Sequence, residues 1–190
     1  MDPQPAAPAS RRSLLGIAGL AGAAAVLIGA QRTSAAANRP TDADRELLTQ
    51  ALGIELAMRD LYRLASAAGA DELFAAFAEN HRGYADSISA ITGQPARDRD
   101  EELYSQYEAD FDSSDTASVA SAAYELEQEA VATHLGLVGE YEGTDAVTVG
   151  TAILVIEGRM ATVLAELAGQ GDDLDALLGS LDPASAGGLG

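Results

Sequence analysis

The sequence predicts an all-α protein, and three observations support this prediction. Apolar residues recur at helical spacing through four segments between residues 42 and 169. Tryptophan is absent and aromatic residues make up 5% of the chain, a composition that suits helices better than β-sandwiches or barrels. Long stretches lack proline. Because 47% of the residues are hydrophobic, we expect one domain with a real core.

The chain begins with a segment typical of an export signal. Residues 10–37 contain the pair Arg11-Arg12, an apolar run over residues 14–30 and small residues over 34–37. This run of 17 residues is short for a transmembrane helix, which needs about 20. The arginine pair and its neighbours resemble a twin-arginine signal, which implies export of the folded protein. An uncleaved leader would be the protein's only link to a membrane.

Two predicted helices follow the leader. The first spans about residues 42–68, and Thr41 with Asp44 forms a capping signal at its start. The second begins after Asp71 and ends at Gly93. The short turn between them predicts a tight helical hairpin.

A second helical hairpin is predicted after a long connection. Residues 94–114 are charged and irregular, and they are numerous enough to cross over along a bundle. The third helix begins at Ser114 or Asp115, and the fourth spans about residues 144–169. Two hairpins joined by one long connection between helices two and three are the layout of a ferritin-like four-helix bundle.

Three regions are therefore expected along the chain. They are a signal segment over residues 1–37, a helical bundle over 38–169 and an acidic, glycine-rich tail over 170–190. Leucines in the tail allow a short amphipathic turn that docks on the bundle or on a partner. The last residues, from 184 onward, are expected to be disordered.

Composition excludes several classes of function. The chain has 30 acidic and 11 basic residues, a net charge of −19, and all the basic residues are arginine. Residues 1–37 carry a net charge of +2, so the remainder carries −21. Such an acidic surface repels nucleic acid, which we exclude as a partner. No cysteine is present, which excludes disulfides, thiolate metal sites and cysteine nucleophiles.

Each predicted helix places one titratable residue in the middle of its apolar stripe. In chain order these residues are Glu55, His81, Glu127 and Glu157. Burying an unpaired carboxylate is costly, so three carboxylates that face one core need a compensating partner. A metal ion is one such partner. His134 lies two turns beyond Glu127 on the same face and is a more distant candidate ligand.

Four segments carry a family resemblance: ALGIELAMRDLY, FAENHRGYADSISAITG, AYELEQEAVATHLG and AILVIEGRMATVLAELAG. They resemble the four helices of the exported ferritin-like domain family that includes desiccation-related proteins. The resemblance covers about residues 42–169. It implies that Glu55, Glu127 and Glu157 match metal-binding glutamates of helices one, three and four.

The sequence departs from the family pattern at three ligand positions. His81 stands where the family pattern has a glutamate, and Tyr84 and Met160 stand where it has histidines. An intact di-iron oxidase site is therefore not expected. The three remaining glutamates and His81 could still hold one divalent ion, and Fe, Mn or Zn would suit this set.

A metal-free core is the alternative interpretation. The same side chains would then hydrogen-bond one another, with Tyr84 donating to a carboxylate and a charged His81 beside a glutamate. Of the two, the sequence favours the metal-free outcome.

Two functions follow from these interpretations. The first is an exported ferritin-like protein for stress tolerance or metal handling. The second is a metal-free structural or binding module of the cell envelope that engages an envelope partner or itself. The sequence has no G-x-S-x-G, phosphate-loop or His-Glu-x-x-His motif, and it favours the absence of enzymatic activity.

Overall fold

The structure is a computed structural model that describes residues 39–178. The predicted signal segment and the end of the tail lie outside the described residues. Within them every regular element is a helix, which confirms the all-α prediction. The helices are α2 (Asp42–Ala68), α3 (Glu72–Thr92), α4 (Glu101–Phe111), α5 (Thr116–Glu140), α6 (Thr144–Leu167) and α7 (Leu174–Leu178).

The helix ends confirm the capping signals. Thr41 and Asp44 form a reciprocal capping box, in which Thr41 N donates to Asp44 Oδ2 (2.8 Å) and Asp44 N donates to Thr41 Oγ1 (3.1 Å). Gly69, which follows α2, has a φ of 86°, in the left-handed region that favours glycine. Of the two candidates for the start of α5, Asp115 rather than Ser114 is the N-cap residue.

We predicted that the long connection between the hairpins is irregular throughout. This prediction was wrong, because the connection contains α4. Asp100 caps this helix by accepting hydrogen bonds from two backbone N–H groups of its first turn, both over 3.0 Å. The backbone N of Asp100 also donates to the carbonyl of Gly53 on α2 over 2.9 Å. Phe111, at the end of α4, is fully buried and forms a T-shaped contact with Tyr62, with ring centroids 5.5 Å apart.

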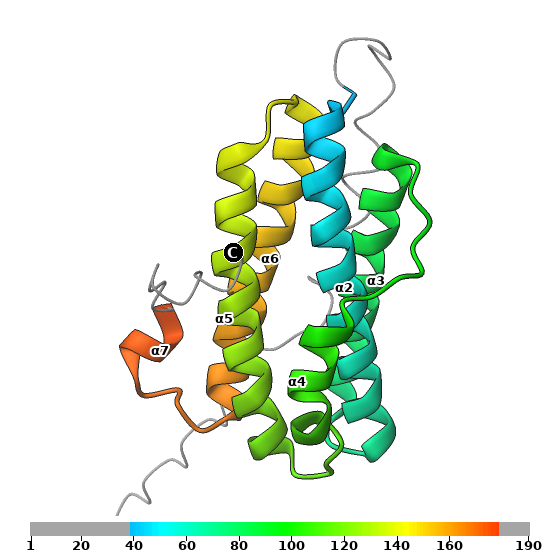
Figure 1. The fold of residues 1–190 in the computed structure, drawn as a ribbon. Coiled ribbons are helices and arrows are strands. Elements are labelled where there is room, and N and C mark those ends of the chain that lie inside the picture. The colour runs from blue at the N-terminus through cyan, green and yellow to red at the C-terminus, as the bar shows by residue number, and fades with distance from the viewer. Residues whose placement is uncertain (1–38, 179–190) are drawn as a thin grey trace, which may run out of the picture. The chain divides into compact units, whose positions relative to one another are not determined.

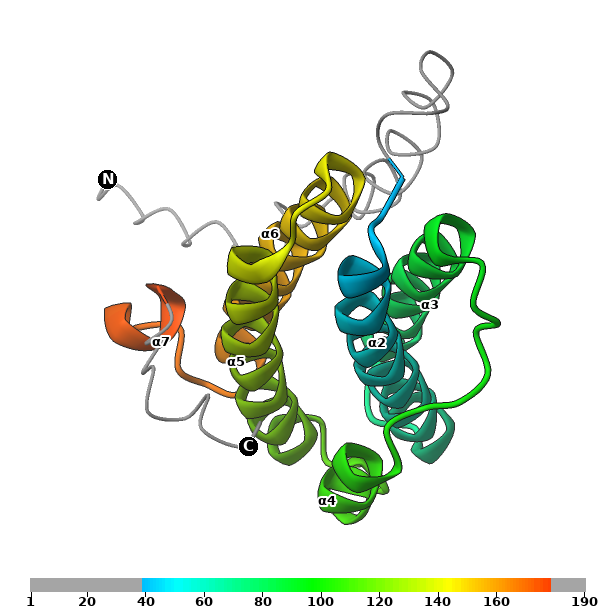
Figure 2. The same ribbon diagram turned by 45° about the horizontal axis from the view of Figure 1, so that its top comes forward.

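The four long helices pack as two hairpins, α2 with α3 and α5 with α6 (Figure 1). Helices α3 and α5 run in the same direction, because the connection that contains α4 returns along the bundle from the end of α3 to the start of α5 (Figure 1). In the view of Figure 2, where the top of the molecule is turned forward, α4 lies between α2 and α5 on one side of the two hairpins. The predicted crossover is therefore present, and part of it is helical.

The first part of the tail docks on the second hairpin. The hydroxyl of Tyr124 on α5 donates to the carbonyl of Ala176 over 3.0 Å, and the hydroxyl of Thr162 on α6 donates to the carbonyl of Leu177 over 3.2 Å. The sequence allowed this part of the tail to dock on the bundle or on a partner, and in the structure it docks on the bundle.

The core between the hairpins is apolar apart from a few buried polar side chains. The largest completely buried residues are mainly leucine, isoleucine, methionine and aromatic side chains from all four long helices. Helix α6 is apolar enough to cross a membrane by length and composition, a test that core helices of soluble proteins also pass. Its Glu157 is completely buried in the core.

A buried aspartate ties the start of α2 to the turn between α5 and α6. Asp44 accepts hydrogen bonds from the backbone N of Glu142 (2.8 Å) and of Gly143 (3.0 Å), in addition to that of Thr41. Burial alone would raise the pKa of Asp44, but these donors outweigh burial and lower the pKa. A Cβ on Gly143 would lie 2.7 Å from Asp44 Oδ2, so this close approach requires glycine.

Replacing Asp44 tests this tie. Asp44→Ala leaves three backbone N–H groups without their acceptor, and we expect the free energy of unfolding to fall by about 2–4 kcal/mol. Urea denaturation followed by circular dichroism measures the change. Asp42→Ala is the matched control, because Asp42 lies in the same turn with a fully exposed side chain. Equal losses in the two variants would contradict the role assigned to Asp44.

Candidate metal centre

All four titratable residues that the sequence places on apolar stripes are completely buried. Glu55 on α2, His81 on α3, Glu127 on α5 and Glu157 on α6 each have an exposed fraction of 0%. His134 on α5 joins them with an exposed fraction of 1%. The centre of the protein therefore holds three carboxylates and two imidazoles.

The register between α2 and α5 brings these side chains together in two layers. Tyr62 contacts Glu127, and Glu55 contacts His134. The two residues on α2 are seven positions apart, and so are the two on α5. Because α2 and α5 run in opposite directions, a step of two turns back along one helix matches a step of two turns forward along the other. Each layer thus takes one residue from each helix.

One layer is a hydrogen-bonded chain centred on His81. Its Nδ1 lies 2.8 Å from Glu55 Oε2, and its Nε2 lies 3.2 Å from Glu127 Oε1. The Tyr62 hydroxyl donates to the same Glu127 oxygen over 2.5 Å, and the Tyr62 ring stacks on His81 with centroids 5.3 Å apart. These contacts hold Glu127 toward His81 and Tyr62.

The hydrogen bonds of this layer correct part of the metal-free interpretation. We expected Tyr84 to donate to a carboxylate, but the hydroxyl that donates is that of Tyr62. The ring of Tyr84 instead forms a T-shaped contact with the ring of His81, with centroids 6.2 Å apart. The expected charged His81 beside a glutamate is consistent with the structure, where the ring lies between two glutamates.

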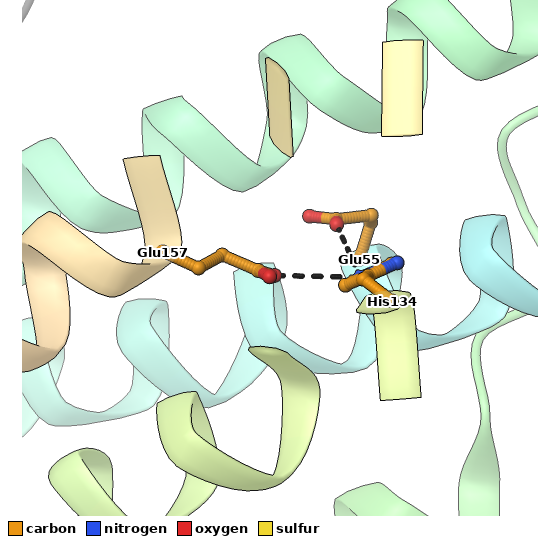
Figure 3. A group of neighbouring side chains, drawn as sticks. All are labelled: Glu55, His134 and Glu157. Carbon is orange, nitrogen blue, oxygen red and sulfur yellow. Dashed lines mark ion pairs between the residues drawn. The ribbon is translucent and has the colours of Figure 1, made fainter. Parts of the chain in front are cut away.

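The other layer brings together Glu55, His134 and Glu157 (Figure 3). His134 Nε2 lies 3.1 Å from Glu55 Oε1 and 3.4 Å from Glu157 Oε1. One candidate ligand atom from each residue lies within 4.8 Å of the other two. The prediction that His134 is a distant contributor was wrong, because His134 lies at the centre of this group.

The polar atoms of this second layer lack hydrogen bonds although they lie close together. Among residues 39–178, neither Glu55 Oε1, nor either oxygen of Glu157, nor either ring nitrogen of His134 has a hydrogen-bond partner. The His134 contacts meet the distance for an ion pair, but the ring N–H does not point at the oxygens. Buried polar atoms without partners are rare and costly, so this group is incomplete as it stands.

The buried charges shift each other's pKa. Burial alone would lower the pKa of His81, but Glu127 and Glu55 outweigh burial and raise it to about 10. Burial alone would also lower the pKa of His134, but Glu157 and Glu55 outweigh burial and raise it to about 10. Burial raises the pKa of Glu157 to about 7 despite the nearby His134. Without a metal ion, the two buried histidines therefore stay protonated at neutral pH.

The second layer fits the donor set of a divalent metal ion. Two carboxylates and one imidazole are ligands that Zn, Mn and Fe accept. Ligand atoms around one such ion, at about 2.0–2.2 Å from it, lie up to about 4.4 Å apart. The three ligand atoms lie within 4.8 Å of one another, so at most small movements are needed to reach this spacing. The unpaired atoms named above would then gain a partner.

Two features of the site differ from the expected pattern. His81 and Glu127, two of the four predicted ligands, are bound to each other and to Tyr62 and lie outside the convergent group. Met160 stands at a histidine position of the family pattern. Its sulfur accepts a hydrogen bond from Asn80 Nδ2 over 3.7 Å. The second histidine of the site comes instead from α5.

Comparisons with protein-family models, with curated proteins and with solved structures find no match for this chain. The functional conclusion therefore depends on the chemistry of the buried core.

The pKa shifts predict how metal-free protein responds to pH. His81 and His134 have folded-state pKa values of about 10, against about 6.5 in the unfolded chain. Their stabilising contribution is complete below about pH 6.5 and is lost as the pH rises toward 10, because only the folded chain then holds both protons. The raised pKa of Glu157 acts in the same direction from about pH 4.5 to 7. We expect the free energy of unfolding to fall from about pH 5 to 10.

Urea denaturation across this range measures the change. Added salt at about 0.5 M screens repulsion between surface carboxylates and leaves the buried contribution in place. Nitrogen-15 spectra of the imidazoles provide a direct control, since both rings should remain doubly protonated at pH 8. Rings that titrate near pH 6.5 would contradict the assignment.

Proposed function

We propose that this protein is an exported ferritin-like protein that binds one divalent metal ion between Glu55, His134 and Glu157. The observation that carries the proposal is the set of buried ligand atoms that converge without hydrogen bonds. A purely structural cluster would be expected to satisfy these atoms with one another. A metal ion satisfies them together and offsets the charge of two buried carboxylates.

The ligand chemistry favours Fe, Mn or Zn as the ion. Carboxylate oxygens with one imidazole nitrogen suit these three metals, and the absence of cysteine disfavours softer ions such as Cu(I). When bound, such an ion supplies positive charge and Lewis acidity at the centre of the bundle. We propose a role in metal handling or stress tolerance, and we assign no substrate.

The ferritin-like part of the proposal is supported by topology. Two antiparallel hairpins are joined by a connection that returns along the bundle, so that α3 and α5 run in the same direction (Figure 1). Ferritin-like bundles have one long crossover of this kind and carry their metal ligands on facing helices. The proposed ligands come from three helices, α2, α5 and α6.

A second candidate function is a metal-free structural or binding module of the cell envelope. The observation in its favour is the layer around His81, where Glu55, Glu127 and Tyr62 are linked by hydrogen bonds without a metal ion. The two candidates describe different layers of the same core. They differ in what the unpaired atoms of His134 and Glu157 bind.

Metal content tests the proposal. Protein purified without chelator or a histidine tag is expected to bind about one ion of Fe, Mn or Zn per chain, measured by plasma mass spectrometry. His134→Ala and Glu157→Gln each remove a ligand and are expected to lower the affinity by more than about 100-fold. Metal should also raise the unfolding temperature of the parent protein but not of these variants.

A surface variant controls for unspecific binding to this acidic protein. Glu79→Gln changes a side chain that is 60% exposed, whereas the proposed ligands are buried, so the metal content should stay at that of the parent. A parent protein without metal, whose stability also does not respond to added Fe, Mn or Zn, would favour the metal-free module.

Export is tested separately from metal binding. Arg11→Lys with Arg12→Lys keeps the charge of the leader but changes the pair that resembles a twin-arginine signal. We expect the variant to be retained in the cytoplasm of a host with this export route, as measured by cell fractionation. Unchanged export of the variant would contradict the proposed route and leave the metal proposal unaffected.

A further inference from the structure

His81 lies between two carboxylates in a position that a cation would occupy. Its two ring nitrogens face Glu55 Oε2 at 2.8 Å and Glu127 Oε1 at 3.2 Å. All three side chains have an exposed fraction of 0%. The ring is held in this position by the stacked ring of Tyr62, whose plane differs from it by 9°.

Both ring nitrogens of His81 must act as donors when Glu55 and Glu127 are ionised. An ionised carboxylate oxygen accepts hydrogen bonds and has no proton to donate. A histidine that bridges two carboxylates through both nitrogens is therefore an imidazolium, with one positive charge. His134 differs from it, because only its Nε2 faces carboxylates and neither of its nitrogens makes a hydrogen bond.

The charges of the core then balance with a single metal ion. Three buried carboxylates carry three negative charges, one divalent ion carries two positive charges, and the His81 imidazolium carries the third. His134 binds metal as a neutral ligand. Beside the His81 imidazolium, a second divalent ion would raise the net charge of the core to +2, which is costly to bury. Without the imidazolium, two divalent ions and one hydroxide formed from a bound water balance the three carboxylates.

We propose that His81 is a fixed cation that limits this core to one metal ion, and that removing its side chain opens a second metal subsite between Glu55 and Glu127. The inference rests on the proposed function for the first ion. Glu55 offers a different oxygen to each layer, Oε1 toward His134 and Oε2 toward His81. It can therefore bridge two ions.

The second subsite would have enough donors once the ring is gone. Glu55 Oε2 and Glu127 Oε1 lose the hydrogen bonds to His81, and Glu127 Oε2 has no partner to begin with. The space of the ring admits water as a further ligand. Carboxylates and water are ligands that Mn²⁺ accepts.

The experiment replaces each of the two buried histidines by alanine. The two replacements should change the number of bound metal ions in opposite directions. The full chain, processed as in the host, is loaded with Mn²⁺ alone, dialysed and measured by plasma mass spectrometry. The parent is expected to hold one ion, His134→Ala none and His81→Ala two. Electron paramagnetic resonance of the His81→Ala protein should show two coupled Mn²⁺ ions, a signal that scattered surface ions do not give.

A charge-preserving variant separates the charge of His81 from its packing. His81→Lys restores a cation between Glu55 and Glu127, and the count is expected to return to one. His81→Asn, a second neutral variant that keeps a polar side chain, is expected to hold two ions and serves if the alanine variant does not fold. Surface carboxylates are the same in all these proteins, so differences in count report on the core.

The outcomes for the first and second ions are distinguishable. A single ion in folded His81→Ala or His81→Asn overturns the inference while leaving the first site intact. Two ions in His81→Lys overturn the role of charge. If the parent holds no ion, the proposed function fails, and the inference is then supported by a gain of one ion in the neutral variants and overturned by no gain.

Discussion

The structure depends on the burial of three carboxylates at the centre of a helical protein. Glu55, Glu127 and Glu157 are completely buried, and each comes from a different long helix. Unpaired charges in such a place would cost several kcal/mol each. The two buried imidazoles offset part of this cost, and the raised pKa of Glu157 shows that they do not offset all of it. Protons held in the core, or a bound cation, offset part of the remaining cost.

Helix register decides which cations meet which carboxylates. Because α2 and α5 run in opposite directions, residues two turns apart on each form two layers, Tyr62 with Glu127 and Glu55 with His134. The first layer is closed by His81 through hydrogen bonds. In the second layer, no side chain among the described residues supplies such hydrogen bonds, and the polar atoms of His134 and Glu157 stay unpaired. The same core thus combines a structural polar cluster with a site that suits a metal ion.

Sequence patterns predicted most of the fold and part of this site. Caps and apolar stripes located all four long helices within about two residues, because these signals are local in the chain. Helix α4 was missed because only Tyr107 and Phe111 of its side chains are buried, too few to make a stripe. His134 was judged distant because it lies about 10 Å along α5 from Glu127. Its proximity to Glu55 follows from the register between helices, which no single helix specifies.

Crystallography of the protein grown with Mn²⁺, with anomalous data that locate the ion, tests the central claim most directly. One anomalous peak is predicted, within bonding distance of Glu55, His134 and Glu157, with His81 still between Glu55 and Glu127. A core without a peak, in which His134 and Glu157 have found hydrogen-bond partners or water, would contradict the claim. A peak ligated by Glu127 in place of His134 would contradict the assignment of the ligands.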